Sequence, residues 1–340
     1  MGSANPLPKE GKFRLVEAVP CPVVPGPTRT KLPITEVIGK LNLRIAGEIT
    51  AAVKDAAVNP GGILNLIRNM TVEATSSSRR EVGKIKSLDF KAAYVLQQFL
   101  KYIAGENVLP GVPATGVLTA AAPYPISADV QLDFEFAHSE SSRQTLLNTT
   151  ELTSLYLNLD WGDANDVATL GAGGTVGFSV NPILKVSAEE YSDLQSKSHR
   201  YGINACNYIE VPIAGANTRL LIDLKRGYLL RGFMIQQFTR AGVYYSTPVD
   251  TVINSIALEL NREVRKSFDD FLILQAQNQY DYHMAVPELG FAFIDLMPDG
   301  KYDQLIDTRR FRDVNVVLNV NAIGSSFVRI YPIEIIPSKL

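Results

Sequence analysis

The sequence predicts an all-β protein made of two tandem antiparallel β-sandwiches, each with eight strands and one short helix. Three observations predict it. Segments such as KLNLRI (40–45) and DVQLDFEF (129–136) alternate apolar and polar residues, which is typical of antiparallel strands packed on one face. Helical spacing of apolar residues is confined to two segments. The order of strand and helix signals occurs twice in 340 residues, and units of many short strands favour jelly-roll sandwiches.

The N-terminal residues 1–33 contain seven prolines. Proline fixes φ and removes a hydrogen-bond donor, so this stretch cannot form a helix or a central strand. We expect an extended arm that ties neighbouring subunits together or touches a surface beneath them; an untidy terminus is the alternative. The arm carries Lys9, Lys12 and Arg14.

The first repeat, 34–191, contains the first predicted helix, at 87–102. Ser87 is its expected N-cap, and Asp89 lies in the first turn, where a carboxylate suits the helix dipole. The Gly-, Pro- and Ala-rich segment 104–125 is expected to be a surface loop. The polar segment 192–204 breaks the pattern, so we place the linker there.

The second repeat, 205–340, contains the second predicted helix, at 267–282, and follows the same order. We match four pairs of segments between the halves: 63–74 with 228–239, the two helices, LYLNLDWGDA (155–164) with FAFIDLMPDG (291–300), and 174–191 with 313–335.

The two acidic turns in these matched segments have two interpretations. Carboxylates at short spacing can bind Ca²⁺, but neither turn has the EF-hand pattern. Asp and Gly are also ordinary turn residues, which is the favoured interpretation. The alternative is a metal site that uses Asp160, Asp163, Asp299 and Asp303.

Composition excludes several classes of function. The net charge is −2, so no basic surplus predicts a nucleic-acid partner. The two cysteines, Cys21 and Cys206, are too few for a disulfide framework and favour a reducing cytoplasm. No apolar run spans a bilayer, and no signal peptide is predicted.

Catalytic signatures are missing from the sequence. His138, His199 and His283 are isolated, and GAGGTVG (171–177) precedes a strand instead of the helix that a phosphate loop needs. We therefore expect no enzyme and no cofactor. Trp161 ends an alternating strand, where it is either a core plug or a sugar-binding platform.

The doubled order over residues 34–336 resembles the double jelly-roll major capsid proteins of icosahedral, membrane-containing viruses, such as tectivirus- and corticovirus-like phage coat proteins. The likeness rests on FAFIDLMPDGKYDQLIDT (291–308), the following strands to 335, and INSIALELNREVRKSFDDFLILQAQNQY (253–280).

This resemblance implies a structural coat protein that forms homotrimers of pseudo-hexagonal outline. Such trimers tile the facets of a virion capsid over an internal membrane, beside other capsid proteins such as a vertex protein, after assembly in the host cytoplasm. Family members place N-terminal arms on the inner side, which makes Lys9, Lys12 and Arg14 candidates for inner-face or membrane contact. The alternative is a secreted two-jelly-roll protein that binds or processes glycans.

Overall fold

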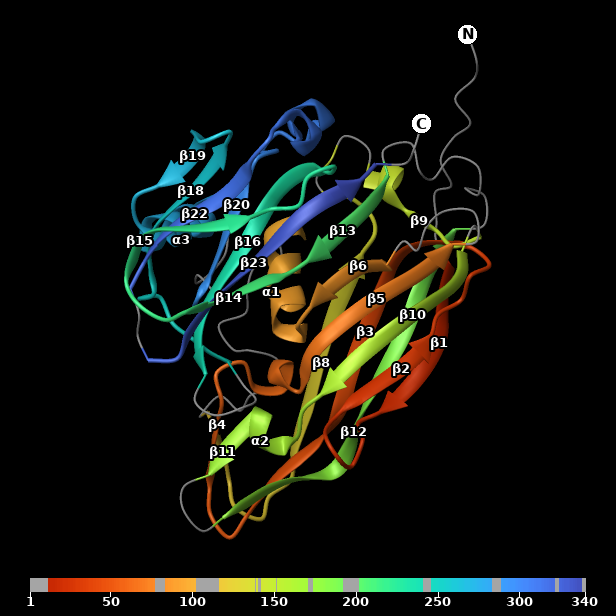
Figure 1. The fold of residues 1–340 in the computed structure, drawn as a ribbon. Helices are drawn as coiled ribbons and strands as arrows, with labels where there is room; N and C mark the ends of the chain where they lie inside the picture. The colour runs from red at the N-terminus through yellow and green to blue at the C-terminus, as the bar shows by residue number, and fades with distance from the viewer. Residues whose placement is uncertain are drawn as a thin grey trace.

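The computed structural model describes residues 12–76, 83–101, 116–137, 139, 142–150, 152–170, 174–191, 202–240, 246–282, 289–321 and 324–337. Over these residues the chain consists mainly of antiparallel strands, which form two sandwiches side by side (Figure 1). The predicted all-β class with two tandem sandwiches is confirmed.

The first sandwich has eight main strands in two sheets. Its strands are β1 (Lys12–Pro20), β2 (Pro27–Lys31), β3 (Val37–Ala52), β5 (Ile67–Ser76), β6 (Gly83–Leu88), β8 (Tyr124–Asp133), β10 (Leu152–Trp161) and β12 (Thr175–Tyr191). One sheet has the order β1-β12-β3-β8 and the other β2-β10-β5-β6, all antiparallel. The helix α1 (Phe90–Lys101) follows β6.

The second sandwich repeats this arrangement. Its eight main strands are β14 (Ile209–Ile213), β15 (Asn217–Asp223), β16 (Leu229–Arg240), β18 (Ile253–Leu260), β19 (Glu263–Phe268), β20 (Phe291–Asp295), β22 (Val314–Val320) and β23 (Ser326–Ile336), and β13 (Ile203–Asn207) precedes them. One sheet contains β14-β23-β16-β20 and the other β15-β22-β18-β19. The helix α3 (Phe271–Asp281) follows β19, as α1 follows β6.

Short elements complete the fold at its ends. They are β4 (Ala56–Val58), β7 (Val117–Leu118), β9 (Leu147–Asn148), β11 (Ala168–Leu170), β17 (Ser246–Pro248), β21 (Ile306–Asp307), α2 (Ala164–Val167) and the 3-10 turns η1 (Gly62–Asn65), η2 (Ser142–Thr145), η4 (Tyr302–Gln304) and η5 (Thr308–Arg310). Within the described part of the chain, no helix has the length and apolar character needed to cross a bilayer.

The pairings match strand for strand between the two sandwiches. Each strand of the first roll pairs with the same neighbours as its equivalent in the second roll. In chain order, the equivalent strands of the two rolls are β1, β2, β3, β5, β6, β8, β10 and β12 in the first and β14, β15, β16, β18, β19, β20, β22 and β23 in the second. Even a β-bulge recurs, at Val72/Glu73 against β6 and at Leu258/Glu259 against β19. Each unit is therefore an eight-stranded jelly roll with a helix after its fifth strand.

This correspondence corrects three of the segment matches made from the sequence. The segment 228–239 lies in β16 and corresponds to β3, whereas β5 corresponds to β18. The strands before the two acidic turns, β10 and β20, also occupy different places in their rolls, and 174–191 corresponds to β23 alone. Hydrophobic patterns alone matched strands of similar composition, because composition does not encode pairing. The match between the two helices is right.

The proline-rich N-terminus is only partly an arm. Residues 12–20 and 27–31 are extended, as expected, but they pair with β12 and β10 as outer strands of the first sandwich. Proline is tolerated in such outer strands, where one side of the ladder has no partner. The first roll therefore begins at β1 and not at residue 34. Residues 1–11 lie outside the described part.

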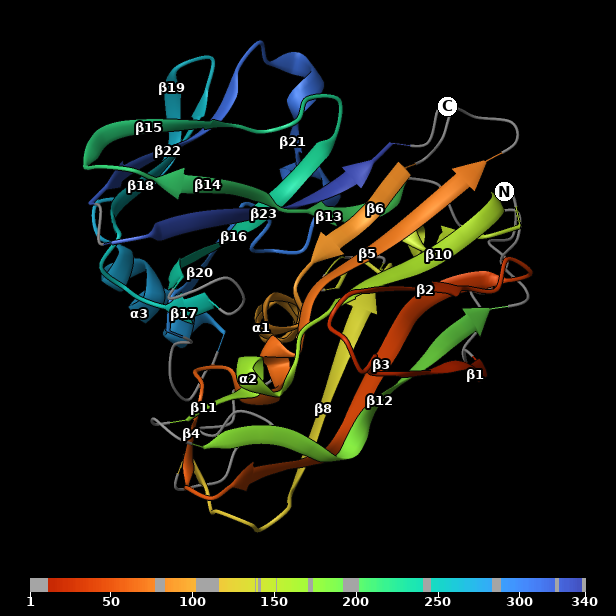
Figure 2. The same cartoon turned by 60° about the horizontal axis from the view of Figure 1, so that its bottom comes forward.

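The two rolls share one sheet. β13 pairs in parallel with β6 through Cys206 and Asn207 opposite Lys86 and Ser87, and antiparallel with β23. The result is a continuous sheet across both rolls (Figures 1 and 2). Of the expected linker 192–204, residues 192–201 lie outside the described part, and 203–204 already belong to β13.

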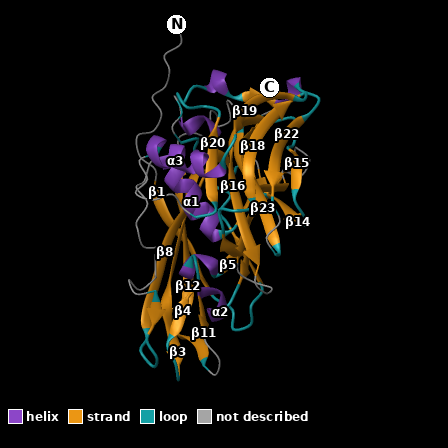
Figure 3. Ribbon diagram, turned by 90° about the vertical axis from the view of Figure 1, so that its left-hand side faces the viewer, coloured by secondary structure: helices purple, strands orange, loops and turns teal. Residues whose placement is uncertain are grey.

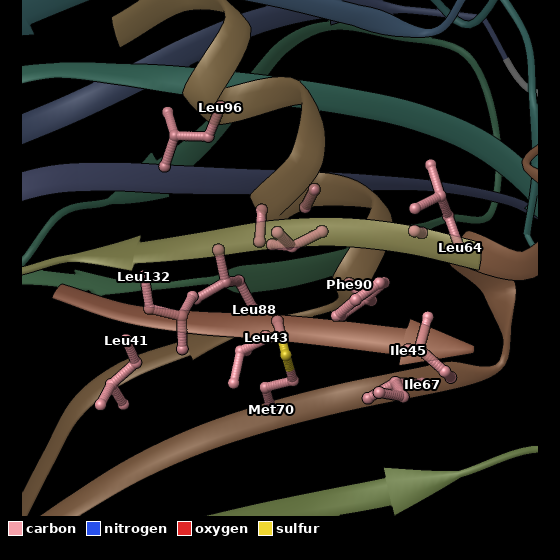
Figure 4. Packing of buried hydrophobic residues seen from close by; sticks show 14 of the residues in the cluster. Leu41, Leu43, Ile45, Leu64, Ile67, Met70, Leu88, Phe90, Leu96 and Leu132 are labelled. Atoms are coloured by element: carbon pink, nitrogen blue, oxygen red, sulfur yellow. The ribbon is translucent and has the colours of Figure 1, made fainter. Parts of the chain in front are cut away.

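The main core fills the first roll and continues into the second. Figure 4 shows Leu43 and Ile45 of β3 pointing toward Met70 and Ile67 of β5, and all four are at most 1% exposed. Burying such a side chain contributes about 1.5–3 kcal/mol. The same cluster includes Phe293 of the second roll, so the rolls do not have wholly separate cores.

Candidate functional site

A buried cluster of polar side chains joins the two rolls. We call the seam the contact of α1 and β6 with β13, β14, β20 and β23. At its centre the guanidinium of Arg329 on β23 donates to Asp89, the residue before α1, at 2.6 Å, and to Glu210 on β14 at 2.6 Å. The hydroxyl of Tyr331 also donates to Asp89, at 3.1 Å. Arg240 binds Glu210 through both guanidinium nitrogens, at 3.1 and 2.8 Å.

Each charge of this cluster has an opposite charge within reach. Burial alone would raise the pKa of Glu210, but Arg329 and Arg240 hold it below its usual value. Burial and the nearby carboxylate of Asp89 raise the pKa of Tyr331, so this phenol stays protonated and donates. Asp89 also accepts from the backbone N–H of Ala92, so the same carboxylate caps α1 and fixes it to the second roll.

Aromatic rings fill the seam beside this cluster. Phe99 of α1 stacks on Phe293 of β20 with ring centroids 5.4 Å apart, and meets Tyr282 edge-on at 5.5 Å. The ammonium of Lys91 lies 5.6 Å from the ring centre of Phe291. Figure 3 shows α1 between strands of the first roll, such as β8, and strands of the second, such as β16. Phe99 is 2% exposed, so the helix is enclosed between the rolls.

A second contact closes the seam near η4. Arg231 on β16 donates to the carbonyl of Ala137 in the first roll and lies over the ring of Phe136, 5.0 Å from its centre. Tyr302 stacks on the same ring at 5.8 Å. These contacts tie the end of β8 to the second roll.

Ionisable groups also line a small cavity of about 30 Å³ in the seam. Lys86 and Cys206 both face it, and burial lowers the pKa of Lys86 to about 8 and raises that of Cys206 to about 11. Close by on β23, burial raises the pKa of Glu334 to about 7, although Lys225 acts in the opposite direction. A cavity of this size accommodates about one water molecule.

The comparisons with known proteins concern structure only. No protein-family model matches the sequence, and no curated protein matches it. The crystal structure of the major capsid protein of Sulfolobus turreted icosahedral virus matches with a TM-score of 0.70 at 12% identity, covering 96% of this chain and 96% of that one. The chain has the double jelly-roll fold of viral major capsid proteins.

Other viral structures share the double jelly roll. The major capsid protein P2 of bacteriophage PM2 matches with a TM-score of 0.55 at 13% identity, covering 95% of this chain and 97% of that one. The Faustovirus major capsid protein matches with a TM-score of 0.57 at 9% identity, covering 98% and 91%. The resemblance predicted from the sequence is confirmed for the fold.

The first acidic turn uses its carboxylates within the double jelly roll. Asp163 accepts from the backbone N–H of Asn165 and caps α2, and Asp166 accepts from the N–H of Asp163 and pairs with Arg68 at 2.8 Å. Asp160 lies on β10, opposite Asn69 and Pro27.

The second acidic turn is separate from the first. Asp299 binds the side chain of Gln304 at 2.7 Å, and Asp303 is exposed in η4. In Figure 1 the blue segment that contains η4 lies at the end of the molecule opposite α2, which follows the first turn. Among the described residues, no group of three or more metal-ligating side chains comes together.

The basic residues of the N-terminus fall in two groups. Lys9 lies outside the described residues, whereas Lys12 and Arg14 are exposed on β1. Arg14 lies 3.9 Å from Glu190 on the neighbouring strand, with most of its side chain in solvent.

Other sequence candidates are structural or lie outside the described residues. Trp161 is fully buried and its indole N–H donates to Thr28 at 2.8 Å, which makes it a core plug and not a sugar platform. The three histidines, residues 171–173 and most of the loop 104–125 lie outside the described part.

The sequence carries only a weak signal for the seam. The predicted N-cap of the first helix, Ser87, lies in β6, and Asp89 is the residue that caps α1. The segment FVRIYPIEII (327–336) is a largely apolar run. The available signal was Arg329 within that apolar run, because a buried arginine requires an acidic partner.

Proposed function

We propose that this chain is the major capsid protein of an icosahedral virus and that its role is structural and not catalytic. The observation that carries this proposal is the strand-for-strand duplication of the jelly roll, with both rolls held in one orientation by the seam. The match to viral major capsid proteins over nearly the whole of both chains supports it.

Three such chains place six similar rolls around one axis, which gives a pseudo-hexagonal trimer suited to tiling facets. We propose that these homotrimers form the capsid of a virion of bacteriophage type, over an internal membrane and beside other capsid proteins such as a vertex protein, with assembly in the host cytoplasm. A net charge of −2 allows many copies to pack without strong repulsion. Lys9, Lys12 and Arg14 are the proposed inner-face contacts, attracted by anionic headgroups.

The test is the mass of the purified protein in solution. Light scattering after size exclusion is expected to give about 112 kDa, three times the chain mass of 37.3 kDa. Electron microscopy of the same particles is expected to show a six-lobed outline. A monomer that does not assemble at any concentration, alone or with co-expressed capsid proteins, contradicts the proposal.

A further inference from the structure

The two helices occupy equivalent places but differ in exposure. Phe90 and Phe271 begin the helices, each after an aspartate that caps it. Counting from these starts, the seam-facing Lys91 and Phe99 of α1 correspond to Leu272 and Tyr280 of α3. Lys91 and Phe99 are at most 3% exposed, whereas their counterparts are 55% and 83% exposed.

The strands before the helices show the same contrast. KSLDF (86–90) precedes and begins α1, and KSFDDF (266–271) precedes and begins α3. Lys86 pairs with Val72 and Lys266 with Leu258, immediately beside the recurring bulge, so these lysines are equivalent. β6 has β13 on its outer edge, whereas β19 is an outer strand with exposed residues, including Val264 at 59%.

The counterpart of β13 is the first half of β1. Ile203 to Cys206 pair with Ile336 to Ile333, and Lys12 to Leu15 pair with Glu190 to Ser187. Since β23 and β12 are equivalent, Leu15 corresponds to Cys206. β1 is an outer strand, and its Phe13 and Leu15 are 65% and 64% exposed.

We propose that the contact between two copies repeats the seam within the chain. In it, α3 and β19 of one copy take the places of α1 and β6, and β1 and β12 of the second copy take the places of β13 and β23. This inference rests on the proposed capsid function and identifies the contact between subunits of its trimer. β19 and the edge of β1 pair in parallel, with Lys266 opposite Leu15 of the second copy.

The surfaces that this contact brings together are complementary. Leu272 and Ile273 of α3 are 55% and 62% exposed, and on the other side Leu15 and Ile183 are 64% and 41% exposed. Association buries all four. In the proposed contact Asp270 of α3 faces Lys185 of the second copy, which is exposed in the single chain. Lys185 is equivalent to Tyr331, the partner of Asp89 within the chain.

Part of the proposed intersubunit contact is polar where the seam is apolar. Arg44 and Asp129 on the outer face of the first roll correspond to Met234 and Phe293, which are buried in the seam. The ion pair between Arg44 and Asp129 is largely exposed. A polar face keeps each folded chain soluble before assembly, as expected for a contact that forms only after the chain has folded.

The proposed contact joins different copies head to tail. β1 and β19 lie at opposite ends of the molecule in both views (Figures 1 and 2), so one chain cannot make the contact with itself. The contact is heterologous, each copy offering β19 to the next. If each contact repeats the rotation between the rolls, six rolls from three chains close the ring.

The test is a disulfide between copies at the matched register. The variant Leu15→Cys/Lys266→Cys is oxidised with copper phenanthroline, and the products are separated without reductant. Covalent species of two and three chains are expected. The control Leu15→Cys/Leu221→Cys places the second thiol on β15, an outer strand on the far edge of the same sheet, and is expected to give none.

The outcomes separate this contact from the proposed function. A trimer by light scattering without specific cross-links overturns the contact and leaves the capsid proposal standing. Failure of the wild-type protein to form a trimer overturns both. A trimer with cross-links in the matched variant alone supports both.

A second test does not depend on disulfide formation. Ile273→Asp/Tyr280→Asp changes two side chains that are exposed in the single chain, so the fold is expected to persist by circular dichroism while the mass falls from about 112 to about 37 kDa. Leu221→Asp changes a leucine that is 48% exposed on β15, and is expected to keep the trimer. A trimer in the double variant contradicts the proposed contact.

Discussion

Arg329 and Asp89 lie 240 residues apart in the chain and 2.6 Å apart in the fold. Arg329 comes from the last strand of the second roll, and Asp89 caps the helix of the first. Their ion pair is enclosed by both rolls, with each side chain 10% exposed. The capsid fold proposed here thus depends on a contact that neither roll possesses alone.

Arg329→Ala is expected to destabilise the chain strongly. The change leaves Asp89 and Glu210 without their shared cation in a buried site, which typically costs about 3–5 kcal/mol. Urea unfolding measures the loss. Arg309→Ala is the matched control, because Arg309 pairs with Asp307 at the surface and its removal is expected to leave the midpoint unchanged. Equal midpoints for both variants contradict the role assigned to the seam.

Phe99→Ala is expected to lower the stability of the folded chain, and Tyr280→Ala is expected to weaken the association of chains. Phe99 is packed within the chain, so its truncation is expected to lower the free energy of unfolding by about 3–5 kcal/mol. Tyr280 is 83% exposed, so its truncation is expected to weaken association and leave the folded chain intact. Denaturation curves and dilution series by light scattering distinguish the two effects.

Glu334 is expected to make stability depend on pH. Burial raises its pKa from 4.5 to about 7 in the folded chain. Between these values the folded chain holds a proton that the unfolded chain releases, so the free energy of unfolding falls as pH rises and levels off above pH 7. The loss is at most about 3.4 kcal/mol, at 1.36 kcal/mol per pKa unit.

Glu334→Gln removes this titration while keeping the shape of the side chain. The difference in unfolding free energy between pH 4.5 and pH 7.5 is expected to shrink relative to the wild type. Urea titrations at both pH values measure it. An unchanged difference shows that Glu334 does not carry this part of the pH dependence.

The two thiols are expected to be inert in the native chain. Cys21 and Cys206 are free and buried, and burial raises the pKa of each to about 11. At pH 8 roughly one thiol in a thousand is then ionised, and the thiolate is the reactive form. Ellman's reagent is expected to detect two thiols per chain after denaturation and to react only slowly before it. Rapid labelling of the native protein contradicts this assignment.

Chelation is expected to leave the trimer intact. Asp163 caps α2 and Asp299 binds Gln304, so protein groups already engage these carboxylates. Light scattering with and without a calcium chelator, together with the melting temperature, checks this. Dissociation of the trimer by the chelator supports the metal site predicted as the alternative for Asp160, Asp163, Asp299 and Asp303.

Alternation predicted the strands and spacing predicted the helices, because both follow from which face is buried. Leu41, Leu43 and Ile45 face the core of β3 as expected, and Phe90 begins a helix after Asp89. The recurring helix starts also located the duplication. These features are local, and local sequence encodes them.

Pairing was harder to predict because it depends on distant residues. The resemblance of 63–74 to 228–239 reflects shared apolar character, whereas their neighbours in the sheets differ. The edge strands within residues 12–31 were missed because proline argues against central strands but allows outer ones. The partner of Asp89 could not be inferred, because nothing in the sequence around Asp89 indicates that it contacts Arg329.

The pairing of β1 with β12 has a consequence for synthesis on the ribosome. Lys12 is translated long before its partner Glu190, so the first roll cannot close until that later strand has been made. During that interval Phe13 and Leu15 belong to an unpaired strand, a state prone to aggregation. The prolines between β1 and β2 oppose premature ladder formation there, because each lacks the N–H that a foreign strand would need. The prolines at the N-terminus thus reduce aggregation of the nascent chain until the strands that pair with β1 and β2 have been translated.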